Sequence, residues 1–332
     1  MGEELSFPRS DFDEVVALIE KARFRAMRAA NAELIGMYWD IGAYVSGKTA
    51  AAGWGKSVVS DFSAFLRSRY PSAKGFSAQN IWRMKQFYET YRGNEKLSPL
   101  VREISWTNNL QILSGCKTDE AREFYLRLCA ANRYSKRELE RQIDSALYER
   151  TMVSKAANRE LVERNSGLSA LRDSYVFEFL DVAEPFQEKD LKRQLVSHLR
   201  EFLLEMGADF TFVGEEYRVQ VGNSDFFIDL LLYNRALACL VAIELKIGAF
   251  KPEHLGQINF YLEALDRDER RKNENPSVGL VLCASKDDSV VEYALSRSLS
   301  PTMVAEYTLH LPDKEMLEEK LRELAELALD GE

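Results

Sequence analysis

Residues 226–247, FFIDLLLYNRALACLVAIELKI, decide the fold because they hold two apolar runs joined by a short polar turn. The runs, Phe226–Tyr233 and Ala238–Ile247, are too apolar for edge strands and favour two central strands of one sheet. Asn234 and Arg235 mark the turn between them. This turn would fold the first strand back against the second.

Three charged residues interrupt the two runs: Asp229 in the first, and Glu244 and Lys246 in the second. Side chains two positions apart on a strand share a face, so Glu244 and Lys246 are expected to point the same way. The turn lets Asp229 approach Glu244. Charged groups in apolar strands are costly unless they are paired or bind a cation. The pattern therefore predicts one charged site on the sheet.

The chemistry of these residue types suits a metal ion. Two carboxylates held within a few ångströms repel each other, and hard oxygen ligands of this kind suit magnesium. The metal would polarise a phosphoryl oxygen and lower the pKa of a bound water. Lys246 would position that water or stabilise charge that develops on the phosphate. The set favours hydrolysis of a phosphodiester. A structural Asp–Lys–Glu ion cluster is the alternative that these residues leave open, since Glu-x-Lys alone is a common pattern.

The first half of the chain predicts helices and no long strand. Apolar residues recur at helical spacing through this half. The expected helices are a helix over residues 11–46, a second helix that ends at Tyr70, a third from Ser77 to Tyr91, and three more over Trp106–Ser114, Asp119–Asn132 and Ser135–Arg150. Ser77 is a plausible N-cap. Ser135 and Glu138 have the spacing of a capping box, which places the start of the last of these helices.

The second half of the chain changes to a mixed pattern. Residues 188–206 predict one amphipathic helix that Gly207 stops, and a charged helix is expected over Asp313–Leu329. The further elements between these helices are expected strands at Phe210–Val213, Glu216–Val221 and Val278–Cys283, and an expected helix at Pro252–Leu265. This order is typical of an α/β domain. We therefore expect an all-helical domain over residues 1–165 and an α/β domain over residues 166–332.

Composition narrows the class of protein. The net charge of −9 hides a basic region, since residues 43–137 carry 16 Lys and Arg against 7 Asp and Glu, which is +9. A local surplus of this kind matters for phosphate contacts more than the total. The four cysteines form no CxxC pair, and no apolar run is long enough to cross a membrane, so the default expectation is reduced thiols and a cytoplasmic address. No GxxxxGK[ST] phosphate loop occurs, so no nucleotide cofactor is expected.

The segment that ends in the Ser77–Tyr91 helix has the layout of a helix-turn-helix. Basic residues around it would meet DNA phosphates, and the candidates are Arg67, Arg69, Lys74, Arg83, Lys85 and Arg92. The alternative is an ordinary solvated face of a bundle helix, because short helix–turn–helix spacing is common. A role in dimerisation or in binding another protein also stays open for this half of the chain.

The site residues resemble a known family. Asp229 followed by Glu244-Leu245-Lys246 matches the PD-(D/E)XK nuclease signature, with Ile228 at the position of the motif's proline. The run FFIDLLLYNRALACLVAIELKIGAFKPEHLGQINFYLEALD resembles the YhcG-type, RecB-like nucleases. The stretches GWGKSVVSDFSAFLRSRYPSAKGFSAQNIWRMKQFYE and ISWTNNLQIL resemble the N-terminal domain of that family, so the resemblance covers nearly the whole chain.

The resemblance implies a restriction-endonuclease-like fold for the C-terminal domain. It makes Asp229 and Glu244 metal ligands and Lys246 the catalytic lysine. Gln257 and Tyr261 match the family's glutamine–tyrosine motif, although the i, i+4 spacing alone fits plain packing on one helix face.

The resemblance also implies a further acidic metal ligand from the first helix of the domain. Glu188 is our first choice for this ligand and Glu201 our second. The family often carries another acid near Lys192, where this sequence departs from the pattern.

These expectations combine into one function, a magnesium-dependent DNA endonuclease, with manganese as a substitute metal. The helical domain would hold or select the DNA, and a homodimer is expected from the resemblance. One alternative is a nucleic-acid-binding module whose nuclease fold no longer cuts, against which the intact Asp229, Glu244 and Lys246 argue. Another is an assembly protein that uses its helical half as an adaptor.

Overall fold

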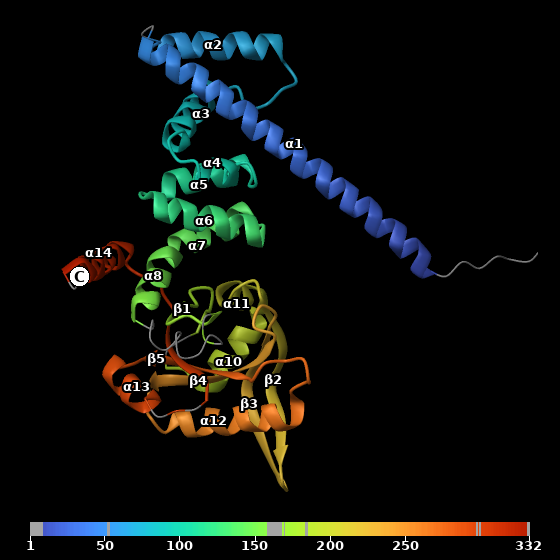
Figure 1. Cartoon of the computed structure of the whole chain (residues 1–332), viewed down its shortest axis with the longest axis vertical. Helices are drawn as coiled ribbons and strands as arrows, with labels where there is room; N and C mark the ends of the chain where they lie inside the picture. Colours follow the sequence, from blue (N-terminus) through green and yellow to red (C-terminus); the bar gives the residue numbers. More distant parts are fainter. Residues whose placement is uncertain are drawn as a thin grey trace, which may run out of the picture. The chain divides into compact units, whose positions relative to one another are not determined.

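The computed structural model describes residues 9–51, 54–157, 168, 170–182, 185–296, 298 and 300–330. The chain forms two compact units, Met1–Ile143 and Asp144–Glu332, and Figure 1 shows helices in the first and a sheet covered by helices in the second. This confirms the predicted class, a helical N-terminal region followed by an α/β C-terminal domain. The domain boundary predicted at residues 165 and 166 lies outside the described residues. No described helix is long and apolar enough to span a bilayer.

The first unit is built from helices, as the sequence predicts. The described helices are α1 (Arg9–Ala51), α2 (Lys56–Arg69), α3 (Ala78–Tyr91), α4 (Leu97–Leu100), α5 (Trp106–Gly115), α6 (Asp119–Asn132) and α7 (Lys136–Asp144). The side chains of Ser77, Ser105 and Thr118 cap α3, α5 and α6, each accepting a hydrogen bond from a backbone N–H three residues later. The short helix α4 is not among the predicted elements.

One predicted helix is two helices in the structure. The helix expected over Ser135–Arg150 ends as α7 at Asp144, and α8 (Leu147–Ala157) begins after a turn at Ala146. The φ of Ala146 is 51°, a left-handed angle that ends an α-helix. The capping box is present, since Ser135 N–H donates to Glu138 Oε2 over 2.7 Å and Glu138 N–H donates to Ser135 Oγ over 3.4 Å.

The second unit contains a six-stranded sheet in the order β1-β6-β5-β4-β3-β2. The strands are β1 (Ser174–Val176), β2 (Phe210–Val221), β3 (Ser224–Asn234), β4 (Cys239–Ala249), β5 (Val278–Ser285) and β6 (Thr302–Thr308). The pairs β2–β3 and β3–β4 are antiparallel, and the remaining pairs are parallel. The two strands predicted over residues 210–221 are one strand with a register shift between Phe212 and Gly214. The sequence analysis missed β1 and β6.

The helices of the second unit are α8, α10 (Glu188–Ser197), α11 (Leu199–Met206), α12 (His254–Ala264), α13 (Asp288–Leu295) and α14 (Lys314–Asp330), with a π-helical turn η2 (Leu265–Glu269) after α12. The prediction of one helix over residues 188–206 is wrong. The chain breaks at His198, whose φ of −111° and ψ of 39° are not helical, and this separates α10 from α11. Helix α13 was not predicted.

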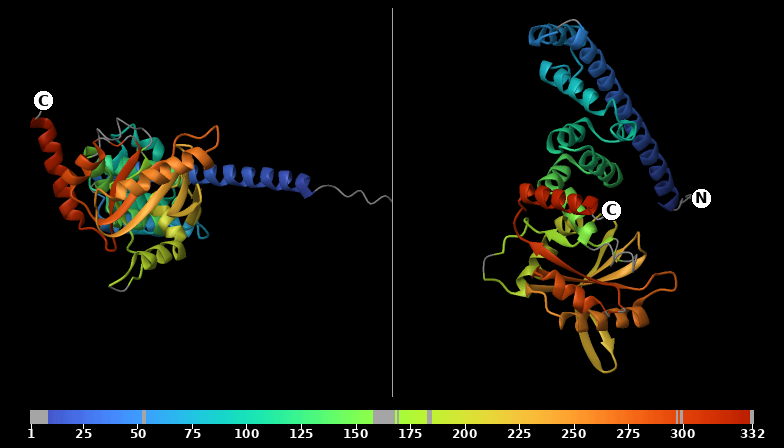
Figure 2. Two further views of the ribbon diagram at one scale, coloured as in Figure 1. Left: turned by 90° about the horizontal axis from the view of Figure 1, so that it is seen from below. Right: turned by 60° about the vertical axis from the view of Figure 1, so that its left-hand side comes forward.

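Helices cover both faces of the sheet (Figures 1 and 2), and buried apolar residues of the central strands lie on both faces. Ile243 and Leu245 of β4 belong to a buried cluster with residues of α10 and α11, whereas Ala242 belongs to a second cluster with α12. Helix α12 approaches the sheet closely, because a Cβ at Gly279 of β5 would lie 2.7 Å from Ile258 Cγ1. Burial on both faces explains why the two runs of the deciding stretch are so apolar.

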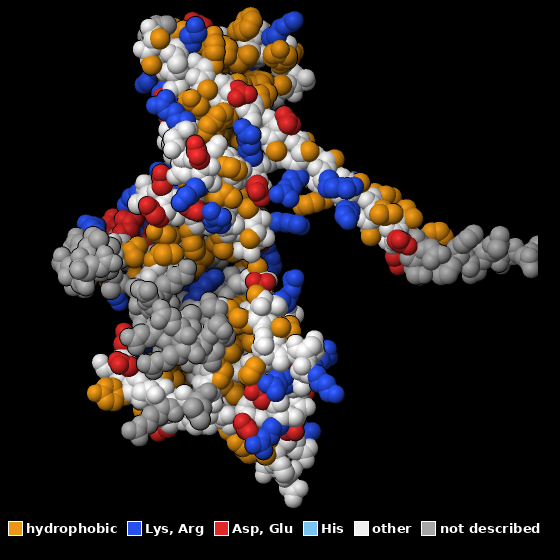
Figure 3. Space-filling view, in the orientation of Figure 1, with side chains coloured by type: hydrophobic (Ala, Val, Ile, Leu, Met, Phe, Trp, Pro, Cys, Tyr) orange, Lys and Arg blue, Asp and Glu red, His pale blue; other side chains and the backbone are white. Residues whose placement is uncertain are grey.

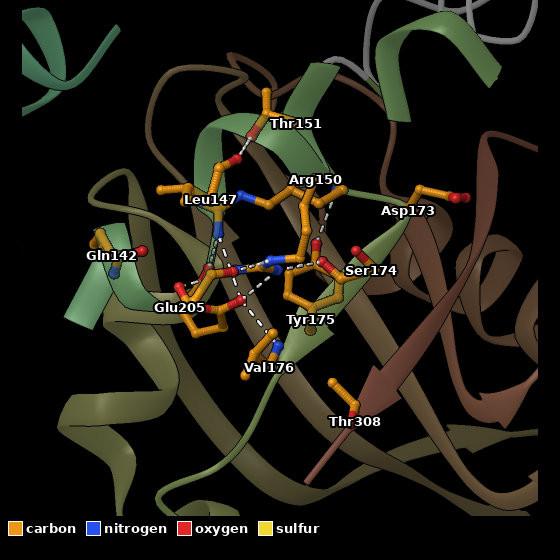
Figure 4. Close-up of polar contacts among 12 residues, drawn as sticks. Gln142, Leu147, Arg150, Thr151, Asp173, Ser174, Tyr175, Val176, Glu205 and Thr308 are labelled. Carbon is orange, nitrogen blue, oxygen red and sulfur yellow. Dashed lines mark hydrogen bonds and ion pairs between the residues drawn. The ribbon is translucent and has the colours of Figure 1, made fainter. Parts of the chain in front are cut away.

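A buried ion pair joins α8 to α11 and β1 (Figure 4). Arg150 Nη1 lies 2.9 Å from Glu205 Oε1, and the two side chains are only 4% and 0% exposed. Arg150 also donates to the carbonyls of Ser145 and Ser174, and Val176 N–H donates to the Glu205 carboxylate over 3.0 Å. Each charge therefore has several partners, which offsets the cost of removing both from water.

Removing one member of this pair should destabilise the second unit. We expect Arg150→Met to lower the free energy of unfolding by about 3 kcal/mol, because the buried Glu205 carboxylate would lose its 2.9 Å ion pair and keep only Arg172 Nη1, 3.7 Å away, as a cationic partner. Urea denaturation measures the change. The control Arg193→Met removes an arginine that is 75% exposed and pairs with Asp190, and it should cost no more than about 1 kcal/mol. Equal effects of the two substitutions would contradict the assignment.

Candidate active site

The two predicted carboxylates meet where β3 and β4 separate. The last pair in the antiparallel register is Leu230 with Ile243, so the next step of the same register brings Asp229 opposite Glu244. There the Asp229 carboxylate replaces the strand partner, because its Oδ2 accepts a hydrogen bond from Leu245 N–H over 3.0 Å. The divergence of the strands thus fixes one acid against the backbone of the other strand.

Lys246 joins this pair from the same strand as Glu244. Its Nζ lies 2.8 Å from Glu244 Oε1 and 3.3 Å from Glu188 Oε2 at the start of α10. The Glu244 side chain is only 2% exposed, and the Lys246 side chain is 17% exposed. The structure therefore brings together four residues that the sequence analysis named, from β3, β4 and α10.

Lys192 is a member of the site that the sequence analysis did not assign a role. Its Nζ lies 3.2 Å from Asp229 Oδ1 and 2.8 Å from Glu216 Oε1. Lys192 follows Glu188 by four residues, and this spacing places both on one face of α10. That spacing was the available signal, whereas no local pattern points to Glu216 of β2. Two lysines thus lie among four carboxylates.

Burial and neighbouring charge shift the proton equilibria of the site. Burial, with a further contribution from the Asp229 charge, raises the pKa of Glu244 from 4.5 to about 7, against the opposing effect of Lys246. Burial alone would lower the pKa of Lys246, but the carboxylates of Glu244 and Glu188 raise it. In the same way, Glu216 and Asp229 raise the pKa of Lys192 against the effect of its burial. Both lysines therefore stay charged at neutral pH.

The carboxylate oxygens of the site supply part of the ligand set that a hard cation needs. Glu244 Oε2 is buried and has no hydrogen-bond partner, although a buried carboxylate oxygen normally accepts at least one hydrogen bond. A divalent cation between Glu244 and Asp229 would supply the missing partner. Among the described residues, however, no three His, Cys, Asp or Glu side chains are arranged as a metal site. Asp229 and Glu244 would therefore hold a cation with water or substrate oxygens completing its shell.

The predicted glutamine–tyrosine pair lies on α12 beside these acids. Gln257 Nε2 donates to the Tyr261 hydroxyl over 2.9 Å, and that hydroxyl donates to the carbonyl oxygen of Phe227 over 2.8 Å. Phe227 precedes Asp229 by two residues, so Tyr261 fastens α12 to the part of β3 that carries the acid. Burial raises the pKa of Tyr261, and the charges of Glu244 and Asp229 add to this effect.

Glu201, the second choice for the further metal ligand, makes no described contact with the carboxylates and lysines of the site. Glu201 lies on α11, where its carboxylate is 3.8 Å from Arg200 Nη1 and its side chain is 36% exposed. Glu188, the first choice, is the acid that contacts Lys246. The metal-binding roles of Glu188 and Glu201 stay predictions.

The basic residues proposed to contact DNA lie in the helical unit. Arg67 and Arg69 are exposed in the last turn of α2, and Lys74 is exposed in the loop that follows. Arg83 is exposed on α3. Lys85, on the same helix, pairs with Glu89 over 2.8 Å, and its Nζ lies 5.9 Å from the centre of the Trp82 ring. Arg92, the C-cap residue of α3, is exposed as well. Five of the six side chains are thus exposed, and the sixth, that of Lys85, has an acidic partner.

The raised pKa of Glu244 predicts how stability depends on pH in the absence of divalent metal. Between the ordinary value of 4.5 and the folded value of about 7, the folded protein keeps a proton that the unfolded chain has released. The free energy of unfolding should therefore fall as the pH rises through this window, by at most about 1.4 kcal/mol per pH unit, and should then level off.

Urea denaturation with a chelator, from about pH 4 to 8, tests this dependence. Glu244→Gln should flatten it, whereas Glu253→Gln, at a carboxyl that is 73% exposed, should leave it unchanged. A wild-type stability that rises across the window would contradict the assignment.

Comparisons with known proteins identify the family of this chain. The chain matches two family descriptions, "YhcG PDDEXK nuclease domain" over residues 168–322 and "DUF1016 N-terminal domain" over residues 14–150. "Putative nuclease YhcG" of Escherichia coli (strain K12) is 32% identical over 347 residues, which cover 93% of this chain and 92% of that protein. The "crystal structure of a repair endonuclease from Pyrococcus abyssi" covers 40% of this chain and 50% of its own at 13% identity and a TM-score of 0.27, too low to carry an argument. The chain belongs to the YhcG family, in which a DUF1016 N-terminal domain precedes a PDDEXK nuclease domain.

Proposed function

We propose that this member of the YhcG family is a magnesium-dependent endonuclease that hydrolyses phosphodiester bonds in DNA. The observation that carries the proposal is the pair of carboxylates, Asp229 and Glu244, at the point where β3 and β4 separate, with Lys246 beside them. The buried Glu244 oxygen that lacks a hydrogen-bond donor supports a cation there. The match to a nuclease domain supports a phosphodiester as the substrate.

Each residue of the site has a proposed part in this reaction. Asp229 and Glu244 would hold magnesium, or manganese in its place, and the bound metal supplies a polarised phosphoryl oxygen and a water of lowered pKa. Lys246 would orient the attacking water or stabilise negative charge on the phosphate. Glu188, which we propose as the further metal ligand, lies 3.3 Å from Lys246 Nζ and would share its carboxylate with that lysine.

Gln257 and Tyr261 are proposed to position the site. The hydrogen bond from the Tyr261 hydroxyl to the Phe227 carbonyl holds the backbone two residues before Asp229. Gln257 donates to the same hydroxyl from an exposed position on α12. Its side chain is therefore accessible to a substrate, and the pair would keep Asp229 in place while the substrate binds.

A second candidate function has one observation in its favour. Lys192 and Lys246 already pair with the four carboxylates of the site over 2.8–3.3 Å. An ion-pair cluster of this kind can serve a structural role, as in a nucleic-acid-binding or assembly protein that has kept the nuclease fold without cutting. The same experiment separates the two functions, because only the first requires metal-dependent cleavage.

Cleavage of DNA with magnesium should depend on the three central residues. We expect Asp229→Asn, Glu244→Gln and Lys246→Met each to lower the cleavage rate by at least about 100-fold, because each removes a group that acts on the transition-state charge. Chelation of the metal should abolish cleavage. Plasmid DNA and RNA of the same sequence, incubated in parallel with the purified full chain, report the rate and the substrate class.

The matched control for Lys246→Met is Lys251→Met. Lys251 follows the end of β4, the strand that carries Lys246, and its side chain is 66% exposed. This variant should cleave like the wild type. If the wild type and the site variants have the same activity, or if none of them cuts, the nuclease proposal fails and the second candidate gains support.

The helical unit is proposed to bind the DNA backbone, in a protein that acts in the cytoplasm as a homodimer. The support is the surplus of +9 over residues 43–137 and the exposure of Arg67, Arg69, Lys74 and Arg83. Phosphate contacts from such residues carry affinity without base specificity. The hydrogen bond from Asn80 N–H to the Ser77 hydroxyl fixes the start of α3, the helix that carries Arg83.

Replacing these cations should weaken DNA binding in a salt-dependent way. Each phosphate contact that is lost should reduce the slope of log affinity against log salt by about 0.9, so Arg67→Gln with Arg83→Gln should reduce it by about 2. Fluorescence anisotropy of labelled duplex DNA over a salt series measures the slope. Lys320→Gln, on helix α14 of the other unit, is the control. An unchanged slope in the double variant would contradict the proposed contacts.

A further inference from the structure

The N-terminal part of α1 stays exposed to solvent in a single copy of the chain. Every residue from 12 to 30 is exposed, and Figures 1 and 2 show this part of α1 lying apart from α2–α7. The exposed side chains include Phe12 at 58%, Val16 at 55%, Ile19 at 51% and Met27 at 71%. An isolated helix of this length is marginal in water, so the segment needs packing from elsewhere.

The exposed apolar residues form a stripe that α1 does not use for its own unit. Phe12, Val16, Ile19, Ala26 and Ala30 recur at helical spacing on one face, which also carries the exposed Arg23. Figure 3 shows hydrophobic side chains gathered along this part of the helix.

A different face of α1 meets the rest of the helical unit. Phe24 lies 4.4 Å from the Arg133 guanidinium, Arg28 pairs with Glu103 over 3.0 Å, and Asn31 donates to the Ile104 carbonyl over 3.0 Å. Phe24, Arg28 and Asn31 are spaced four and three residues apart and so share a face, which is turned away from the stripe.

Charge along the same segment is divided into two blocks. Residues 12–20 carry Asp13, Glu14 and Glu20 and no basic residue. Residues 21–30 carry the basic residues Lys21, Arg23, Arg25 and Arg28 and no acidic one. Two such segments side by side repel each other when parallel, whereas an antiparallel arrangement sets the acidic block of each against the basic block of the other. The segment is therefore complementary to itself.

We propose that residues 12–30 of α1 pair antiparallel with the same segment of a second copy and form the dimer interface of this protein. The two-fold axis passes near residues 20 and 21, where the acidic block meets the basic block. Phe12 and Val16 of one copy then face Ala30 and Ala26 of its partner, which are small enough for the helices to approach closely, and Ile19 lies opposite the aliphatic stem of Arg23. The interface is isologous, as in most homodimers. The inference gives the proposed homodimer a surface and does not rest on the nuclease reaction.

The mass of the full chain in solution tests the interface. We expect a dimer by light scattering and sedimentation, and a dissociation constant at least about 100-fold higher when Val16→Glu and Ile19→Glu are combined, because two apolar contacts per copy are replaced by charges. Tyr293→Glu, at an aromatic that is 83% exposed on α13, is the control and should stay dimeric. Asp229→Asn should also stay dimeric, which separates this test from that of the proposed reaction.

Charge-exchange variants test the interface even if the combined Val16→Glu and Ile19→Glu variant fails to fold. A chain with Asp13→Lys, Glu14→Lys and Glu20→Lys should be monomeric, as should a chain with Lys21→Glu, Arg23→Glu and Arg25→Glu. An equimolar mixture of the two chains should form a heterodimer, since attraction replaces repulsion. Circular dichroism reports helix content in each sample.

Engineered cysteines test the orientation, since the four native cysteines are buried. Glu20→Cys should form a disulfide with itself under oxidation, whereas Phe12→Cys should not and should instead link to Ala30→Cys in a mixture. A wild type that is monomeric at every concentration would overturn the proposal. So would a dimer that survives the combined Val16→Glu and Ile19→Glu change, or self-linkage of Phe12→Cys.

Discussion

The hydrogen bond from Leu245 N–H to the Asp229 carboxylate is the contact on which the candidate site depends. It occurs where β3 and β4 stop pairing, after Leu230 and Ile243. A backbone N–H that loses its strand partner in a buried region must find another acceptor, and the acid supplies it. The same bond therefore ends the antiparallel pairing, fixes Asp229 and brings its charge against the buried Glu244. Substituting this aspartate would affect the sheet as well as the chemistry.

Ion pairs near the Asp229 carboxylate explain how charged acids are accommodated in an apolar sheet. Lys246 lies between Glu188 and Glu244, and Lys192 lies between Glu216 and Asp229. Each lysine thus spans two elements of the domain and neutralises acids that would otherwise repel each other. The buried Glu244 Oε2 has no hydrogen-bond donor, so the network is incomplete at this atom. A cation at this place would lower the pKa of Glu244 and complete the network.

The sequence predicts the central part of the fold because that part is governed by local periodicity. Alternation in β4 places Glu244 and Lys246 on one face, and a continuous apolar run identifies β3 as buried. The role of Lys192 could not be predicted in this way, since its contact with Asp229 spans 37 residues of chain and depends on where α10 lies against the sheet. The breaks at Ala146 and His198 were missed for another reason: each is a change of backbone angles within a run whose side chains keep helical spacing.

The basic residues of the first half of the chain divide into two groups with different consequences. The surplus over residues 43–137 excludes the run from Lys21 to Arg28, which lies on α1. Cations of the first group include Arg67, Arg69 and Arg83 on the shorter helices α2 and α3, where no acidic block of equal size accompanies them in the sequence. Cations of the second group follow directly after Asp13, Glu14 and Glu20 on the same helix. When two copies pair antiparallel about a two-fold axis, the basic block of each copy lies against the acidic block of the other. Residues 12–30 carry three acidic and four basic residues, so pairing of two copies offsets most of this charge. Dimerisation through α1 would not use Arg67, Arg69, Lys74 and Arg83, the exposed cations that are proposed to meet phosphates.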